Sequence, residues 1–348
     1  MRRILASVAA IALLVVAPSV AASAASAATA SATIAPVKYV GHGTAASCTP
    51  AALAKAVRGG GTVKFRCGAK PVTIVLDRTL VVCNTTTCKH PWQDPHAKVV
   101  ERLVLDGGGK VVLSGANKRP ILYANTCQES FGWLDAHCDT QTTPYIVVKN
   151  LVMAKGNATK APTWGGHRLE NLRGGGAIAM RGGHLTVQHV TFRDNRCIKA
   201  DSDAGGGAVR LVGQRVTSRL LDSTFVRNRC ANGGAVSSLQ APMRLQGSTL
   251  TDNVATGSGA SSGKGGNGGA VYFDGTKQSV TIDRSTIQRN HAPEGGPGVF
   301  YVSNDRTGTL TITHSRITKN TGASFWTGKT RSIFFLGKRF VRSGSTIT

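Results

Sequence analysis

Two segments of this sequence combine arginines with carboxylates in a pattern that could bind an anion. The triplet Asn-Arg-Cys occurs at 195–197 and again at 228–230. Four arginines in these segments are candidate substrate-binding residues: Arg193, Arg196, Arg227 and Arg229. Guanidinium groups form charge-assisted hydrogen bonds with carboxylates and sulfates, which makes a uronate or a sulfate the expected ligand. The alternative is that they are ordinary surface arginines paired with nearby aspartates.

Other residues of the same segments suggest a cation site and a proton-transfer pair. Asp201 and Asp203 lie in a turn before glycine, with Asp194 upstream, and three such carboxylates could hold calcium. A solvated turn is the alternative. His189 and Asp222 each stand three residues before a phenylalanine, so they are weak candidates for a general base. A simple hydrogen-bonded pair on the surface is the alternative.

These residues belong to a repeat. Each repeat contains Gly-Gly-Ala followed by Ile or Val and, further along the chain, an apolar residue that two residues separate from an asparagine. The repeats begin at Gly175, Gly206, Gly233 and Gly268, and an altered copy begins at Gly295. The repeat asparagines are 33, 25, 37 and 30 residues apart, and the differences fall in loops. The asparagines close each unit: Asn195, Asn228, Asn253, Asn290 and Asn320. A repeat of this kind predicts a solenoid.

Apolar columns define the kind of solenoid. One column holds Phe192, Phe225, Leu250, Ile287 and Ile317, and the column five residues earlier holds Val187, Leu220, Leu245, Ile282 and Ile312. An odd spacing cannot continue one alternating strand, so the chain must bend at the position of His189 and Asp222. The pattern predicts an all-β, right-handed parallel β-helix. A helical-repeat solenoid is disfavoured by 42 glycines and by Val/Thr-rich segments.

The remainder of the chain gives the domain boundaries. Arg2-Arg3, an apolar run and Ala28-Thr29-Ala30 predict a secretory signal peptide at 1–30, with a membrane anchor as the alternative. We expect a linker at 31–43 and one β-helix domain at 44–348. Within it we expect a short cap helix beginning at Thr49-Pro50, clear repeats at 145–320 and a C-terminal cap at 321–348. The alternative for this tail is a disordered extension, which its aromatic residues disfavour. The mature protein would then be extracellular, without a membrane span.

Eight cysteines fit a secreted protein with disulfides. Cys197 and Cys230 follow equivalent asparagines on neighbouring repeats, so stacking should bring them within disulfide distance. Three other pairings are expected from proximity alone: Cys48–Cys67, Cys83–Cys88 and Cys127–Cys138. Zinc is the alternative ligand for Cys83 and Cys88.

Charge indicates the class of partner. The formal net charge is +25, and no Asp or Glu follows Asp305. Such an excess favours acidic polysaccharide or another polyanion, although it also serves solubility. Specific nucleic-acid binding is not expected, because only 5% of residues are aromatic and basic and aromatic residues are not interleaved.

The Gly-Gly-Ala and Phe-x-x-Asn motifs between Gly175 and Asn320 resemble the repeats of chlamydial polymorphic membrane proteins, which are surface adhesins. More broadly, the chain resembles the pectate-lyase-like superfamily of parallel β-helices. The catalytic signatures of pectate lyases and polygalacturonases are missing, so no family catalytic residue is carried over. From the charge and the stacked parallel face we expect a protein that binds an acidic polysaccharide and, if it is an enzyme, cleaves it by β-elimination, with calcium as a candidate cofactor. A capped solenoid needs no partner subunit, so we expect a monomer. A non-catalytic, adhesin-like surface or matrix protein is the second hypothesis.

Overall fold

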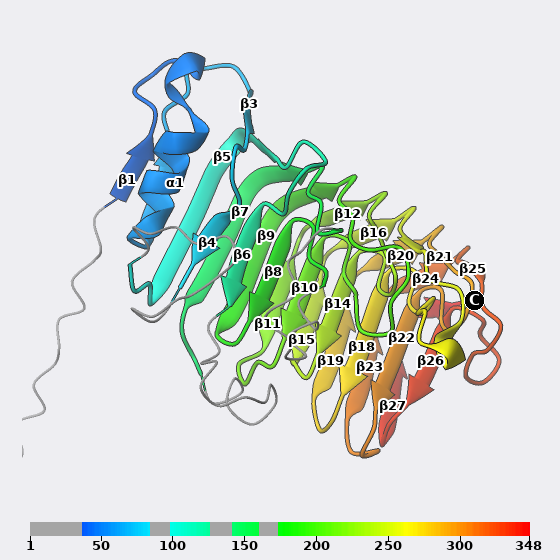
Figure 1. Cartoon of the computed structure of the whole chain (residues 1–348). Coiled ribbons are helices and arrows are strands. Elements are labelled where there is room, and N and C mark those ends of the chain that lie inside the picture. The colour runs from blue at the N-terminus through cyan, green and yellow to red at the C-terminus, as the bar shows by residue number, and fades with distance from the viewer. Residues whose placement is uncertain (1–36, 84–97, 126–140, 160–172) are drawn as a thin grey trace, which may run out of the picture. The chain divides into compact units, whose positions relative to one another are not determined.

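The computed structural model describes residues 37–83, 98–125, 141–159 and 173–348, which belong to one compact unit, Ala35–Thr348. Within these ranges the chain forms successive coils of parallel β-strands (Figure 1). Helix α1 (Pro50–Arg58) precedes the first coils, and two 3₁₀ turns lie at Ala45–Ser47 and Ala260–Ser262. The right-handed parallel β-helix predicted from the sequence is confirmed.

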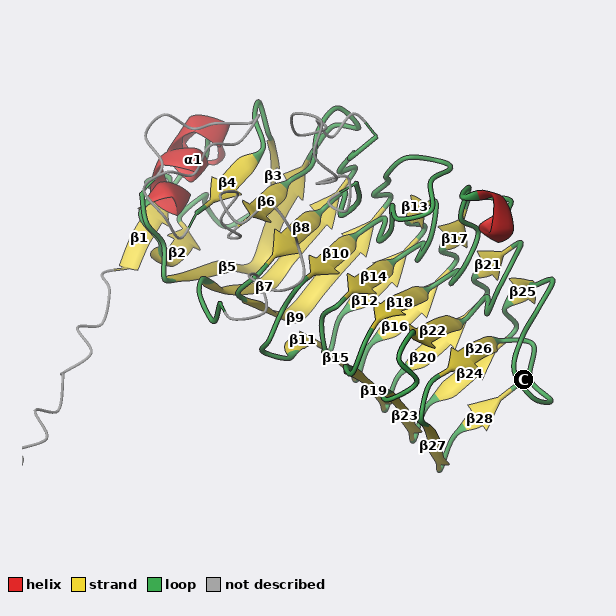
Figure 2. Ribbon diagram, turned by 60° about the horizontal axis from the view of Figure 1, so that its bottom comes forward, coloured by secondary structure: helices red, strands yellow, loops and turns green. Residues whose placement is uncertain are grey.

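The described strands form three parallel sheets (Figure 2). The 8-stranded sheet contains β4 (Leu80–Val82), β6 (Leu122–Asn125), β8 (Ile178–Arg181), β10 (Val209–Val212), β14 (Val236–Leu239), β18 (Val271–Gly275), β22 (Val299–Ser303) and β26 (Ile333–Leu336). We call it the Gly-Gly sheet, because each repeat strand follows a Gly-Gly bend. The 4-stranded sheet contains β13 (Arg229–Cys230), β17 (Val254–Ala255), β21 (His291–Ala292) and β25 (Thr321–Gly322). We call it the short sheet.

The third sheet has 16 strands and is called the long sheet. Its early members are β1 (Val37–Val40), β2 (Gly61–Phe65), β3 (Val72–Val75), β5 (Arg102–Ser114), β7 (Tyr145–Ala154) and β9 (His184–Arg193). After β9 it divides into two rows. The first row is β11 (Ser218–Leu221), β15 (Met243–Gln246), β19 (Ser279–Asp283), β23 (Thr309–Thr313) and β27 (Arg339–Ser343). The second row is β12 (Thr224–Val226), β16 (Thr249–Thr251), β20 (Thr286–Gln288), β24 (Arg316–Thr318) and β28 (Thr346–Ile347).

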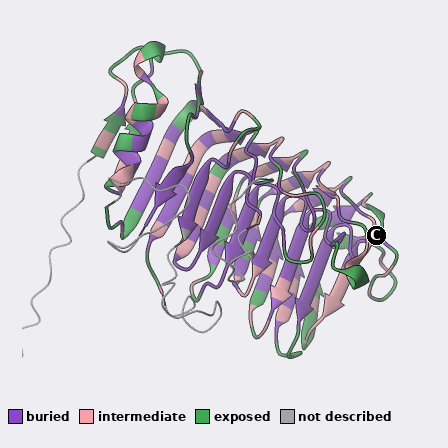
Figure 3. Ribbon diagram, viewed as in Figure 1, coloured by how far each residue is buried: buried purple, intermediate pink, exposed green. Residues whose placement is uncertain are grey.

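The core lies inside the coils, where the two apolar columns meet (Figure 3). Every member of both columns is fully buried, and Phe192 stacks on Phe225 with ring centroids 4.8 Å apart. The expected bend between the columns is present: seven residues at this corner adopt a left-handed backbone with φ between +45° and +60°. They are Asn150, His189, Asp222, Gly247, Arg284, His314 and Gly344. This bend allows columns five residues apart to face the same interior.

Buried hydrogen-bonded ladders join the coils. Each ladder asparagine donates from Nδ2 to the Oδ1 of the asparagine on the next coil, at 2.9 or 3.0 Å, from Asn195 to Asn320. A second ladder follows the left-handed corner, where each serine hydroxyl accepts a backbone N–H from the coil before. Its members are Ser223, Ser248, Ser285, Ser315 and Ser345. The asparagines and the serines each occupy equivalent positions in successive coils, which is what allows both ladders to form.

The N-terminal cap confirms one expectation and corrects another. Thr49 Oγ1 accepts the backbone N–H of Ala52 at 3.1 Å, and Pro50 is the first residue of α1. The buried side chains of α1, Leu53 among them, join the main core and cover its first coil. Strand β1, however, lies inside the segment 31–43 that was expected to be a linker. It pairs in parallel with β2, because Val40 buries its side chain in the core.

The segment 321–348 is another coil rather than a separate cap. Strands β26, β27 and β28 continue the register of the preceding coil. Phe334 stacks on Phe300 and Phe335 stacks on Tyr301, so the aromatic residues of this segment extend columns that begin earlier.

Two of the expected disulfides are present. Cys197 and Cys230 are bonded, with Cα atoms 4.7 Å apart, as stacking of equivalent positions requires. Cys48 is bonded to Cys67. The pairs Cys83–Cys88 and Cys127–Cys138 involve Cys88, Cys127 and Cys138, which lie outside the described residues.

Candidate functional site

The equivalent arginines Arg196 and Arg229 lie on neighbouring coils at the edge of the short sheet. Their backbones form a parallel bridge, and the bonded cysteines Cys197 and Cys230 follow directly, so the disulfide fixes their register. Both side chains are exposed. Arg196 donates to the carbonyl of Asn117 at 3.3 Å. Neither arginine forms an ion pair with a carboxylate in the described residues. Their backbones stand at the coil spacing of about 4.8 Å, so two like charges are carried on neighbouring coils.

The other two predicted arginines have a different environment. Arg227 forms a two-pronged ion pair with Asp194 of the preceding coil, at 2.8 and 3.1 Å, and Arg193 approaches the same carboxylate at 3.4 Å. Burial alone would raise the pKa of Asp194, but the hydrogen bonds and charges of these arginines lower it below its usual value. The structure thus divides the four candidate arginines into a pair that shares one carboxylate and a pair that has none.

The expected calcium ligands are not assembled. In the part of the chain that the structure describes, no three His, Cys, Asp or Glu side chains are grouped so as to hold a metal ion. Asp194 is engaged by arginines, as above. Asp201 accepts the backbone N–H groups of Asp203 and Ala204 and pairs with Arg173 at 2.7 Å. Its carboxylate therefore closes its own turn instead of facing a common site with Asp194.

His189 and Asp222 are neighbours at the left-handed corner, as the column alignment predicts. Their side-chain atoms Nε2 and Oδ2 are 3.9 Å apart, and the side chains are 57% and 48% exposed. Both side chains are thus open to water on the outer surface. The geometry matches the surface pair that was the alternative hypothesis.

A second stacked arginine pair lies on the outer face of the long sheet. Arg219 and Arg244 are direct partners in the parallel register of β11 and β15, and both are exposed. Arg219 forms no ion pair within the described residues. Arg244 lies 3.8 Å from Asp283, which is shared with Arg284. This face thus also presents positive charge at coil spacing.

Asp283 is the carboxylate that Arg244 and Arg284 of this face share, and its ionisation should affect the stability of the fold. Its side chain is only 9% exposed. Burial alone would raise its pKa, but hydrogen bonds from Thr313 and His314 and the charges of Arg284 and Arg244 outweigh burial and lower the pKa. A carboxyl whose pKa is lower when folded stabilises the fold above its unfolded pKa, and this contribution is lost as pH falls through the folded pKa.

We therefore expect Asp283→Asn to reduce the free energy of unfolding by about 1 kcal/mol at pH 7, through loss of charge-assisted hydrogen bonds. Because the wild-type carboxyl also becomes neutral in acid, the difference should shrink below about pH 4. Urea unfolding of both proteins at pH 7 and pH 3 measures this. An equal difference at both pH values would contradict the argument.

A buried polar cluster on the outer face of the Gly-Gly sheet was not predicted. Arg210 is fully buried and donates to the Ser237 hydroxyl and to the carbonyl of Asp203. Nearby, the Tyr272 hydroxyl donates to Asp274 at 3.1 Å, and burial raises the pKa of both groups. The residue after the repeat valine points outward, so the sequence places Arg210 and Tyr272 in one column. The loop that contains Asp203 covers this column, so Arg210 is buried although its side chain points outward from the sheet.

The fold, the ladders and the stacked columns define the protein as a parallel β-helix. The sequence matches the family described as "Right handed beta helix region" over residues 166–340, which is half of the chain. The chain belongs to this family. No match was found among curated proteins or among solved structures. In the described residues, no helix is both long and apolar enough to span a membrane.

Proposed function

We propose that this protein binds an acidic polysaccharide through exposed arginines stacked on neighbouring coils. The observation that carries the proposal is the Arg196–Arg229 pair, whose two charges have no carboxylate partner in the described residues. Like charges on neighbouring coils repel each other, and an anion bound between them removes the repulsion. A polymer with regularly spaced carboxylates or sulfates supplies several such anions.

The remaining charge distribution favours binding over catalysis. The candidate cations occupy different faces, Arg196 and Arg229 on the short sheet and Arg219 and Arg244 on the long sheet. The His189–Asp222 pair lies on the surface at a third position. Recognition of a polyanion needs only a positive surface, whereas β-elimination needs a base and a charge-neutralising group around one sugar. The resemblance to repeats of surface adhesins agrees with a binding role.

We also propose that the protein is secreted and acts as a monomer outside the cell. Two disulfides support an oxidising compartment, and the N-terminal sequence supports a signal peptide at residues 1–30. Acidic polysaccharides are extracellular polymers, so the location and the partner agree.

Replacing both arginines tests the proposal. The double variant Arg196→Gln, Arg229→Gln should bind uronate polymers roughly tenfold more weakly than wild type, since two charge-assisted contacts are lost. Calorimetric titration with polygalacturonate, alginate and a sulfated glycan, at two salt concentrations, measures the change. Wild-type affinity should fall as salt rises.

A matched control removes the same charge elsewhere. Lys277 and Arg306 are exposed cations on adjacent coils at a different corner, so Lys277→Gln, Arg306→Gln should change affinity much less. Equal losses of affinity in both variants would mean that binding depends only on net charge, and would contradict the proposed site. Release of unsaturated sugars, followed by ultraviolet absorbance, would instead establish a lyase. Absence of binding to every polymer would favour the adhesin-like hypothesis.

A further inference from the structure

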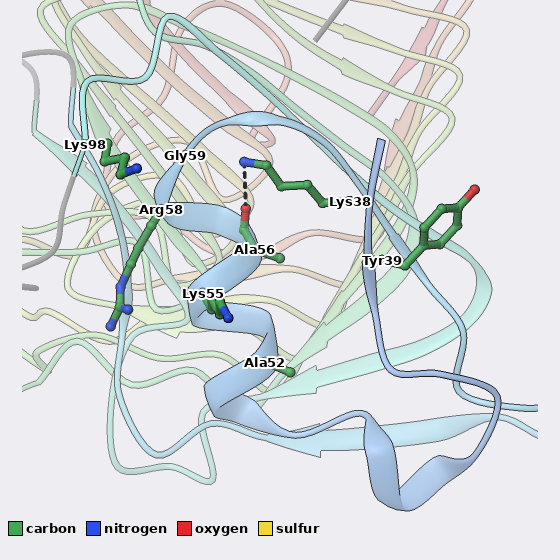
Figure 4. Close-up of a pocket in the computed structure, with 8 residues that line it drawn as sticks. All are labelled: Lys38, Tyr39, Ala52, Lys55, Ala56, Arg58, Gly59 and Lys98. Atoms are coloured by element: carbon green, nitrogen blue, oxygen red, sulfur yellow. Dashed lines mark hydrogen bonds between the residues drawn. The ribbon is translucent and has the colours of Figure 1, made fainter. Parts of the chain in front are cut away.

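A hollow of about 580 Å³ lies at the N-terminal cap, away from the arginine pairs just described. Its walls come from strand β1, helix α1 and the residues just before β5 (Figure 4). Ala52 and Ala56 of α1 contribute apolar surface to its wall, and Tyr39 of β1 also lines it. The hollow is therefore built by three segments that the fold brings together, and it has room for a small ligand.

Four cations line this hollow, and none of its lining residues is acidic. They are Lys38 from β1, Lys55 and Arg58 from α1, and Lys98 from the segment before β5. Among the described carboxylates, none forms an ion pair with any of the three lysines. Lys55 and Lys98 are exposed, so their ammonium groups are accessible to a ligand from solution.

Lys38 is held at the base of this cluster. Its Nζ donates to the carbonyl of Gly60 at 2.8 Å and to that of Ala56 at 3.4 Å, which are backbone acceptors at the C-terminal end of α1. A Cβ at Gly59 would lie 2.7 Å from this Nζ, so the ammonium group lies directly against the backbone at the end of the helix. The close approach fixes one positive charge of the cluster in place.

The positive charges around the hollow repel one another, and the pKa of Lys38 reflects this repulsion. Burial lowers its pKa, and the positive charge of Lys98 lowers it further. An anion in the hollow would relieve this repulsion. Lysine ammonium groups are compact charges that suit phosphate and sulfate groups, whose oxygens each accept a hydrogen bond.

We propose that this hollow is a binding site for a tetrahedral oxyanion, phosphate or sulfate, either as the free ion or as an ester on a small molecule. The charged oxygens contact the ammonium groups of Lys55 and Lys98 at the mouth and Lys38 at the base. The body of an esterified ligand lies against Ala52 and Ala56. The site is separate from the arginine pairs and does not depend on the polysaccharide proposal.

Titration calorimetry with inorganic phosphate, inorganic sulfate and a small phosphate monoester, phenyl phosphate, tests the site on the mature protein. We expect saturable one-to-one binding of at least one probe. The variant Lys55→Gln, Lys98→Gln should bind it at least tenfold more weakly, because two of the charged contacts are lost. Tighter binding of the monoester than of the ions would identify an ester as the ligand; the reverse order would identify the free ion.

Three controls separate this site from the polymer-binding surface. Lys277→Gln, Arg306→Gln should leave the affinity for the small anion unchanged, and so should Arg196→Gln, Arg229→Gln. Amine labelling with mass-spectrometric detection should show protection of Lys38 when the anion is bound. The proposal is overturned by absence of binding to all three probes, by equal affinity in Lys55→Gln, Lys98→Gln, or by labelling of Lys38 that the anion does not change.

Discussion

Asn228→Ala should lower the free energy of unfolding by about 4 kcal/mol, because it removes a fully buried member of the asparagine ladder. The Nδ2 of Asn228 donates to the carbonyl of Phe192 and to Oδ1 of Asn253. Its Oδ1 accepts both the backbone N–H and the Nδ2 of Asn195. Alanine removes four hydrogen bonds where water cannot reach, although Asn195 Nδ2 keeps its bond to the carbonyl of Met153 and Asn253 Oδ1 keeps the backbone N–H of residue 228. Urea unfolding monitored by circular dichroism measures the loss.

Asn304→Ala is the matched control for this substitution. Asn304 is exposed and donates one side-chain hydrogen bond, to Asp274 at 2.8 Å. Water can replace that bond, so the expected cost is below about 1 kcal/mol. A loss of less than 1 kcal/mol for Asn228→Ala would show that the ladder sets register without contributing much to stability.

Phe225→Ala should have a comparable effect, about 4 kcal/mol, for a different reason. The ring is fully buried in the apolar column and stacks on Phe192. Its removal takes away apolar contact and leaves a cavity that the hydrogen-bonded coils cannot close. Thermal and urea unfolding of the variant, compared with wild type, test the magnitude.

Phe340→Ala provides the comparison within the same chain. Phe340 is 36% exposed and stacks on Phe335 at the last coil, with centroids 5.6 Å apart. Truncation there should cost about 1 kcal/mol, since little area is buried and solvent fills the space. Similar losses at Phe225 and Phe340 would contradict the assignment of Phe225 to a closed core.

Several features of the site could be predicted from sequence and others could not. The proximity of Arg196 to Arg229 follows from their equivalent places in the repeat. Whether either is neutralised does not follow, because Asp194 reaches Arg227 through the particular geometry of its corner. The three aspartates of the candidate calcium site are kept apart for a related reason. Asp201 lies near Asp194 in sequence, yet its carboxylate is used by its own turn.

No feature of the repeated sequence predicts the lysine-lined hollow. Lys38 lies in a segment expected to be a linker, and Lys98 is 60 positions away from it in the chain. Only the pairing of β1 with β2 and the docking of α1 place these lysines around one space. The burial of Arg210 could not be predicted from the periodicity either, because the loop that covers it is not part of the repeat.

The sequence by itself determined the β-helix, its two interior columns, the bend between them, the asparagine ladder and the Cys197–Cys230 disulfide. These features depend on equivalent residues occupying equivalent positions in successive coils, and a repeat reveals such equivalence directly. Only the tertiary structure decided which arginines are neutralised, how the outer face of the Gly-Gly sheet is covered, and that the final segment forms another coil. Those features depend on loops of unequal length and on single side-chain contacts between non-equivalent positions, which no periodicity specifies.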